Sequence, residues 1–343
     1  MKELTVNLGE RSYKITVSRG VLRRANEFFN LDRRVLVVTD TGVPKEYSRT
    51  VASCCKEARI ITVPMGEVAK SLEYYSKLLS EMTAFNMTRS DCVVAVGGGV
   101  VGDLSGFAAS SYMRGVDFYN IPTTLLSEVD SSIGGKVAIN FEGVKNIVGT
   151  FYQPKGVLID TEVLKTLPKR QIACGMAEAV KMALTSDAEL FELIESAENL
   201  DDVIDDIIVR SLKIKKRVVE YDEREAGLRR VLNFGHTLGH AIEEADGMKN
   251  LFHGECVALG MLAVSSDAVK ARLIPLLKRL GLPTEYKGDI DGALTFISHD
   301  KKCEGNSLTA VFVDRLGEYR LEKMSVSEFS HIAKDAFSAD FSG

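Results

Sequence analysis

The sequence predicts an α/β N-terminal domain built on a parallel sheet, followed by a mainly α-helical C-terminal domain. Up to about residue 160, short apolar runs alternate with helical stretches, which is typical of parallel strands buried on both faces. From about residue 166 to residue 298 helical periodicity dominates. The length of 343 residues suits two domains, which we expect at 1–166 and 167–343.

The composition indicates a soluble protein without nucleic-acid or membrane partners. The formal net charge is −5, from 43 basic and 48 acidic side chains. No apolar run approaches the ~18 residues that span a bilayer. The six cysteines form no CxxC pair, and no signal peptide is evident, so we expect reduced thiols and a cytoplasmic location. An anionic ligand would need local basic residues.

The first elements are expected as a hairpin and then alternating strands and helices. Period-two patterns predict the hairpin over 3–8 and 12–17. The helices and strands that follow are expected at 21–29, 34–40, 58–63, 72–85 and 91–96. Asp40 would end its strand, and ligands of parallel sheets bind beyond the carboxyl ends of the strands.

A glycine-rich turn follows the third of these strand units. Gly97 to Asp103 leads into a helix of small residues over 104–111, which suits a pyrophosphate at a helix N-terminus. A tight strand-to-helix turn without a ligand is the alternative. The glycines follow the third strand unit rather than the first, so this is not the ordinary Rossmann fingerprint.

Polar and basic residues continue beyond this turn. A strand over 117–121 should precede Thr123 and Thr124, whose hydroxyls could cap a helix or contact a nucleotide. Lys136 follows two glycines, and Lys145-Asn146 lies shortly after. Lysines on glycine-rich turns suit oxyanions, although each alone is more often a solvated surface charge.

The helical domain carries a candidate metal site. His236 and His240 lie four residues apart, on one face of a predicted helix, while Glu178 and His253 are distant in sequence. Glu178, His236 and His253 could form a catalytic zinc site with an open position. The alternatives are a helix start with satisfied histidines and a surface ion pair of Glu178 with Lys181. A metalloprotease helix is disfavoured, because Thr237 occupies the position of its general base. A late hairpin over 308–321 and a last helix after residue 327 complete the chain.

The sequence resembles the 3-dehydroquinate synthase family over nearly its whole length. The resemblance rests on ordered, correctly spaced motifs at 66–70, 97–103, 112–115, 122–124, 129–140, 145–146, 175–181, 222–243, 253–255 and 300–302. It implies an NAD-binding α/β domain, a helical metal-binding domain and an active site between them. Gly42 and Val163 depart from the family pattern, which puts a ribose or adenine contact in doubt.

The resemblance also implies roles for individual residues. The NAD+ contacts would be Asp40, Glu67, Lys70, Gly98, Gly99, Val100, Val101, Gly102, Asp103, Thr123, Thr124, Lys136, Lys145 and Thr166. The metal ligands, to zinc or alternatively cobalt, would be Glu178, His236 and His253. Phosphate would be bound by Lys136, Asn146, His240, one of Lys301 and Lys302 (Lys301 preferred), and Arg114 from a neighbouring subunit of a homodimer. The substrate carboxylate would contact Lys215, Arg229 and Asn233, and the hydroxyls Asp130 and Lys181.

The implied reaction converts 3-deoxy-D-arabino-heptulosonate 7-phosphate to 3-dehydroquinate and phosphate in the shikimate pathway. It combines transient oxidation by NAD+, phosphate elimination, reduction and intramolecular aldol closure. The alternatives are another sugar-phosphate cyclase, such as a 2-deoxy-scyllo-inosose or valiolone synthase, and an NAD-dependent polyol dehydrogenase. A catalytically silent NAD-binding protein is a third. The basic residues at 136, 145, 215 and 229 favour a substrate with phosphate and carboxylate groups.

Overall fold

The computed structural model describes residues 1–224, 227–247, 249–299 and 307–338. The chain divides into two compact units, Met1–Pro168 with Lys215–Arg224, and Lys169–Ile214 with Glu225–Gly343. Helix α7 (Leu200–Tyr221) therefore begins in the second unit and ends in the first. The expected partition into domains 1–166 and 167–343 stays a prediction, because compact packing does not demonstrate independent folding.

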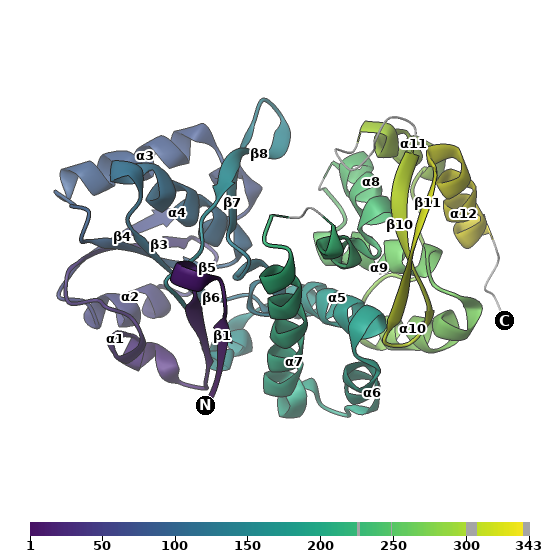
Figure 1. Ribbon diagram of the computed structural model, residues 1–343, viewed down its shortest axis with the longest axis horizontal. Helices are drawn as coiled ribbons and strands as arrows, with labels where there is room; N and C mark the ends of the chain where they lie inside the picture. Colours follow the sequence, from purple (N-terminus) through teal and green to yellow (C-terminus); the bar gives the residue numbers. More distant parts are fainter. Residues whose placement is uncertain (225–226, 248, 300–306, 339–343) are drawn as a thin grey trace. The chain divides into compact units, whose positions relative to one another are not determined.

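The first unit is built on a seven-stranded sheet (Figure 1). In spatial order its strands are β1 (Lys2–Val6), β2 (Tyr13–Val17), β9 (Gly156–Ile159), β6 (Asp117–Pro122), β5 (Cys92–Gly97), β3 (Arg34–Asp40) and β4 (Glu57–Val63). Strands β1 and β2 form the predicted antiparallel hairpin, and the other neighbours pair in parallel. The predicted parallel α/β domain is confirmed.

The strands bury apolar side chains on both faces of the sheet. In β3, Val35 and Val37 join one buried cluster, and Leu36 and Val38 join the other, because successive side chains of a strand point to opposite faces. Helices α3 (Leu72–Ala84) and α4 (Gly99–Ser111) lie on one side of the strands, and α1 (Ala25–Phe28) and α2 (Lys45–Ser53) lie on the other (Figure 1). This double covering explains the continuously apolar strands of the sequence.

Two local elements differ from expectation. The helix expected over 21–29 is a 3-10 turn, Val21–Arg24, followed by the four-residue α1. The Asp160 carboxylate accepts hydrogen bonds from the backbone N–H groups of Gly20 and Leu22 at 2.7 and 3.0 Å, which stabilises the tighter turn. Helix α4 begins at Gly99, five residues before the expected helix, so the glycine-rich turn forms its first turn.

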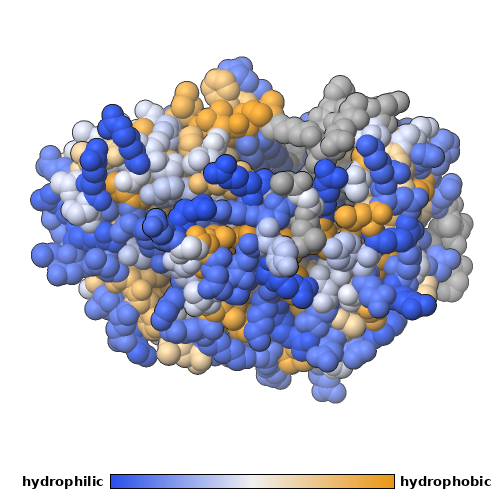
Figure 2. All heavy atoms as spheres, viewed as in Figure 1, coloured by the Kyte–Doolittle hydropathy of each residue, from blue (hydrophilic) through white to orange (hydrophobic). Residues whose placement is uncertain are grey.

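An antiparallel hairpin outside the main sheet follows β6. It consists of β7 (Lys136–Phe141) and β8 (Val144–Phe151), which we did not expect from the sequence. Its exposed apolar side chains are Phe141, Val144, Ile147, Val148 and Phe151. Figure 2 shows apolar atoms gathered over the region where Figure 1 places β8.

The second unit is mainly helical, as predicted. Besides the first part of α7, its helices are α5 (Lys169–Ser186), α6 (Ala188–Ser196), α8 (His236–Asp246), α9 (His253–Ala263), α10 (Asp267–Arg279), α11 (Ile290–Leu294) and α12 (Val326–Ser338). Strands β10 (Ser307–Arg315) and β11 (Glu318–Ser325) form the late hairpin that we predicted. None of the helices in the described part of the chain has the length and apolar character needed to cross a membrane.

Close packing of α9 against α5 and α8 depends on glycine. A Cβ atom on Gly254 would lie 2.5 Å from the Cα of Cys174 in α5. A Cβ atom on Gly260 would lie 1.9 Å from the carbonyl oxygen of Gly235, immediately before α8. Both distances are far below van der Waals contact, so these glycines let three helix backbones approach one another.

Candidate active site

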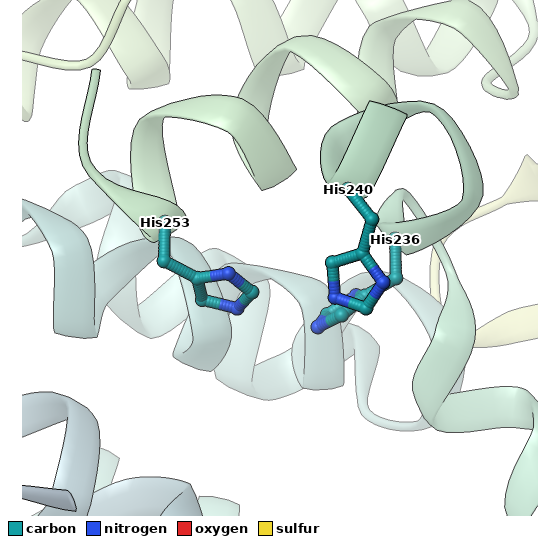
Figure 3. Close-up of side chains that lie close together, drawn as sticks. All are labelled: His236, His240 and His253. Atoms are coloured by element: carbon teal, nitrogen blue, oxygen red, sulfur yellow. The ribbon is translucent and has the colours of Figure 1, made fainter. Parts of the chain in front are cut away.

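The second unit brings Glu178, His236 and His253 together from three helices. Glu178 lies in the middle of α5 and is fully buried, whereas His236 and His253 are the first residues of α8 and α9. The Nε2 atoms of His236 and His253 lie 3.5 and 3.6 Å from the same carboxylate oxygen, Oε1 of Glu178. Figure 3 shows the rings of His236, His240 and His253 turned toward a common space.

This geometry fits a divalent metal ion. Two ligand atoms bonded to a tetrahedral metal at about 2.0–2.2 Å lie roughly 3.3–3.6 Å apart. The two Nε2-to-Oε1 distances match this spacing, and they exceed the usual hydrogen-bond range of about 2.7–3.2 Å. The Nδ1 atoms bond elsewhere, that of His236 to the carbonyl oxygen of Phe234 at 3.1 Å and that of His253 to Oε2 of Glu243 at 3.0 Å. Both rings thus present Nε2 toward Glu178, as metal-ligating imidazoles do.

His240 offers a second set of three donors. Nitrogen atoms of His236, His240 and His253 lie within 4.8 Å of one another. The ring of His240 stands 5.2 Å from that of His236 and 5.7 Å from that of His253, measured between centroids. Distances alone therefore allow either three imidazoles or two imidazoles with Glu178.

The charges around Glu178 favour its ionised form. Burial raises the pKa of this carboxyl, but the charge of the Lys181 ammonium and the neighbouring His253 outweigh burial and bring it to about 2. Lys181 forms an ion pair with Glu178, and both side chains are buried. Burial lowers the pKa of His253, whereas the neighbouring carboxylates of Glu178 and Glu243 raise it to about 9. An anionic carboxylate is the state that a metal ligand needs.

An ion pair positions the start of α9. Nε and Nη2 of Arg170 bond Oε1 and Oε2 of Glu255 at 2.6 and 2.7 Å, and Arg170 also bonds the carbonyl oxygen of Asn250. Oε2 of Glu255 accepts the backbone N–H of Phe252 at 2.7 Å. The backbone of His253 is held between these contacts and the close approach of Gly254 to α5.

In the first unit, the glycine-rich turn requires glycine for close packing. A Cβ atom on Gly97 would lie 2.5 Å from Cγ2 of Val101, and one on Gly99 would lie 2.9 Å from Oγ of Ser131. The carbonyl oxygen of Gly97 accepts the backbone N–H of Thr123 at 3.0 Å, which joins the ends of β5 and β6. The N-terminus of α4, with Gly98 before it and Val100 in its first turn, therefore lies at the carboxyl edge of the sheet. The first backbone N–H groups of a helix have no partner within the helix, and at this place they suit a phosphate group.

Asp40 lies at the carboxyl end of β3, as predicted. Its Oδ1 accepts hydrogen bonds from the backbone N–H groups of Gly42 and Val43 at 2.7 and 3.1 Å. Burial raises the pKa of the carboxyl, and the two hydrogen bonds, which lower it, offset only part of this effect. A Cβ atom on Gly42 would lie 2.5 Å from the sulfur of Met65. Met65 is exposed and its flexible side chain can move aside, so this contact does not by itself require glycine at position 42. Thr166 bonds the hydroxyl of Tyr47 at 3.0 Å.

A hydrogen-bonded network around the buried Lys70 joins predicted NAD+ contacts to a predicted phosphate contact. Nζ of Lys70 donates to Oδ2 of Asp103 at 2.7 Å and to Oδ1 of Asn146. Nδ2 of Asn140 donates a hydrogen bond to Oε2 of Glu67 at 2.8 Å, and Oδ1 of Asn140 accepts one from the backbone N–H of Asn146 at 2.9 Å. Burial raises the pKa of Asp103, and Lys70 offsets part of this effect. We did not identify Asn140 as a site residue from the sequence, where nothing distinguishes it from other polar strand residues.

Another ion pair of the first unit joins the buried Lys215 to the half-buried Asp130. Nζ of Lys215, in the last part of α7, lies 2.6 Å from both Oδ1 and the carbonyl oxygen of Asp130. These residues were predicted to contact the substrate carboxylate and a hydroxyl. The chain between 168 and 215 belongs to the other unit, so this pairing of distant residues depends on the return of α7.

The predicted phosphate contacts are distributed over both units. Lys136 and Arg114 are exposed in the first unit, and Lys145 lies on β8. Arg114 has a left-handed backbone, with φ of 68°. Asn233 ends the 3-10 turn Leu228–Asn233 of the second unit, whereas the side chain of Arg229 and all of Lys301 and Lys302 lie outside the described structure. That these groups meet around one phosphate stays a prediction.

The chain is similar to known proteins over nearly its whole length. Residues 60–174 match the model of the 3-dehydroquinate synthase N-terminal region, and residues 175–303 match that of its C-terminal region. The 3-dehydroquinate synthase of Streptococcus suis is 41% identical over 347 residues, which cover 95% of this chain and 98% of the relative. The chain belongs to the 3-dehydroquinate synthase family. The synthase of Clostridium beijerinckii is also 41% identical, over 96% of this chain and all of the relative.

Solved structures extend the likeness of this 3-dehydroquinate synthase family member to neighbouring cyclases. A 2-deoxy-scyllo-inosose synthase complexed with carbaglucose-6-phosphate, NAD+ and Co²⁺ has a TM-score of 0.87 at 25% identity. A 2-epi-5-epi-valiolone synthase from Streptomyces hygroscopicus with NAD+ and Zn²⁺ bound has a TM-score of 0.86 at 27% identity. Each alignment covers 97% of this chain and 99% of the other. A probable glycerol dehydrogenase from Sinorhizobium meliloti shares the fold, with a TM-score of 0.64 at 15% identity. That alignment covers 94% of this chain and 96% of the dehydrogenase.

Proposed function

We propose that this chain is a 3-dehydroquinate synthase, a lyase that converts 3-deoxy-D-arabino-heptulosonate 7-phosphate to 3-dehydroquinate and phosphate. The observation that carries the proposal is the nearly full-length identity of 41% with curated enzymes of that name. The cluster around Glu178 supports it, because the reaction uses a metal next to an alcohol that NAD+ oxidises. The biosynthetic role in the shikimate pathway suits a cytoplasmic enzyme.

NAD+ would bind to the first unit, where it supplies the transient removal and return of a hydride. The N-terminus of α4 would bind the pyrophosphate through backbone N–H groups, as its glycine-dependent packing allows. The other proposed contacts are Asp40, Glu67, Lys70, Gly98 to Asp103, Thr123, Thr124, Lys136, Lys145 and Thr166. Lys70 would hold Asp103 and Asn146 in fixed orientations toward the cofactor and the substrate.

Glu178, His236 and His253 would hold one divalent metal ion, zinc or cobalt, which supplies Lewis-acid stabilisation of the substrate alkoxide when bound. We prefer this set to the three histidines because both Nε2 atoms face Oε1 of Glu178 at metal-ligand spacing. A buried anionic carboxylate also supplies charge that three neutral imidazoles lack. His240 then remains for the substrate phosphate.

The anionic substrate would be bound by basic side chains and by polar side chains that the protein already holds in ion pairs. Asp130 and Lys215 fix each other in the first unit, and Lys181 is fixed by Glu178 in the second, so their polar atoms are oriented before substrate arrives. Arg229 and Asn233 would complete the carboxylate contacts. The phosphate contacts would be Lys136, Asn146, His240, Lys301 and Arg114 of a neighbouring subunit, which makes a homodimer part of the proposal. We assign no side chain as the base for the proton at C6, which the substrate phosphate itself can accept.

One assay tests the proposal. The purified protein is incubated with the heptulosonate phosphate, catalytic NAD+ and Zn²⁺, and the release of phosphate is compared with the formation of dehydroquinate. Equal amounts of both products, without net NADH, are expected. Turnover of glucose 6-phosphate in place of the heptulosonate would favour another sugar-phosphate cyclase. Net NADH from glycerol without phosphate release would favour a polyol dehydrogenase, and either result would overturn the assignment.

A further inference from the structure

Glu243 contacts the histidine cluster from its outer side. This residue lies on α8, seven positions after His236, which is about two helical turns and therefore the same face of the helix. Its side chain is 14% exposed, and its Oε2 lies 3.0 Å from Nδ1 of His253. The contact joins α8 to the first residue of α9.

The two proposed imidazole ligands are supported in different ways. Nδ1 of His236 bonds the backbone carbonyl oxygen of Phe234, which lies two residues away and moves with His236 itself. Nδ1 of His253 bonds a side chain on a different helix. A replaceable carboxylate therefore helps to orient the His253 ring, whereas the Nδ1 contact of His236 is made within its own segment of chain.

The other contacts at the start of α9 act on the backbone. Arg170 and Glu255 hold the turn before the helix, and Gly254 packs on α5. None of these three contacts touches the His253 ring. A hydrogen bond at Nδ1 leaves the lone pair for a metal on Nε2, which is the atom 3.6 Å from Glu178.

We propose that Glu243 is a positioning residue for the metal, which orients His253 and selects the ring tautomer that presents Nε2 toward Glu178. The inference rests on the proposed metal site of Glu178, His236 and His253. Glu243 would touch neither substrate nor metal. Outer carboxylates of this kind typically contribute about 10- to 100-fold to metal affinity.

The test measures Zn²⁺ affinity by competition with a chromophoric chelator, on the full-length protein. Glu243→Ala removes the acceptor, and Glu243→Gln keeps its size without its charge. Glu244→Gln is the matched control, because Glu244 is the exposed neighbour on the same helix. We expect the dissociation constant for Zn²⁺ to rise about 10- to 100-fold in Glu243→Ala, less in Glu243→Gln, and not at all in the control.

A double-mutant cycle separates positioning from a general structural effect. Glu243→Ala is combined with His253→Ala, and the absorption of bound Co²⁺ is recorded alongside Zn²⁺ affinity. If Glu243 acts through His253, its loss has no further effect on either readout once the imidazole is gone. Wild-type affinity in both Glu243 variants, or an equal loss with and without His253, would overturn the inference. Failure of the wild-type protein to bind Zn²⁺ would instead overturn the proposed metal site and the inference with it.

Discussion

Replacing Gly260 with alanine should separate α8 from α9 and weaken the metal site without touching any proposed ligand. The new Cβ atom would lie 1.9 Å from the carbonyl oxygen of Gly235 and 3.0 Å from the backbone nitrogen of Gly239. A carbon–oxygen contact needs roughly 3.3 Å, so the backbones must part by about 1.4 Å at this point. Functional geometry tolerates only about 0.5 Å. His236 directly follows Gly235, so its position relative to His253 on α9 should change.

Two measurements check this prediction. Overpacking typically costs about 1–3 kcal/mol, and we expect the upper end for Gly260→Ala because the obstacle is backbone, which has no alternative rotamer. Urea unfolding measures this loss, and chelator competition measures the weaker binding of Zn²⁺. Gly227→Ala is the control, because its Cβ atom would meet nothing within 4 Å. Wild-type unfolding and wild-type Zn²⁺ affinity in Gly260→Ala would refute the argument that glycine packing builds the site.

Three other changes test separate parts of the structure. His236→Ala should leave the protein folded but without stoichiometric Zn²⁺ after dialysis, as metal analysis will show; retained metal would exclude it as a ligand. Lys70→Ala should weaken NAD+ binding and, by leaving the half-buried Asp103 without its cation, destabilise the protein by about 1 kcal/mol, as titration and urea unfolding will show. Burial raises the pKa of Asp187, but hydrogen bonds from Arg210 and the start of α6 outweigh burial and lower it. The ionised carboxylate therefore stabilises the folded protein at pH values above its pKa in the unfolded chain, about 3.9, and this stabilisation is lost as the pH falls through its lower pKa in the folded protein. In Asp187→Asn, the free energy of unfolding measured in urea should fall less steeply with decreasing pH in this range.

The sheet could be predicted because its strands carry their own signal. In Arg34–Asp40 every residue after the first is buried, so hydrophobicity alone marks the strand, and Asp40 marks its end. The 3-10 turn at Val21–Arg24 could not be predicted, because the carboxylate that stabilises it belongs to Asp160, far along the chain. The hairpin of β7 and β8 was missed as well, since the exposed apolar residues of β8 lack the alternation of a half-buried strand.

The candidate site was only partly predictable for a similar reason. Spacing placed His236 and His240 on one helix face, but it could not show that Glu178 and His253 approach from two other helices. Their assignment as ligands came from family resemblance. Glu243 had no signal of its own, because an acidic residue two turns along an amphipathic helix is ordinary, and only the contact with His253 distinguishes it.

The path of α7 limits how this protein can be divided. A gene fragment that ends at Pro168 would encode the whole main sheet but not Lys215–Arg224, which belong to the same compact unit. Such a fragment would leave Asp130 without the Lys215 ammonium, 2.6 Å away in the intact chain. The complementary fragment would begin at Lys169. It would contain Lys215–Arg224 but not Met1–Pro168, the rest of the compact unit to which these residues belong. The two halves are therefore not interchangeable modules, and a chimaera of two family members would need the end of α7 and the sheet from the same parent.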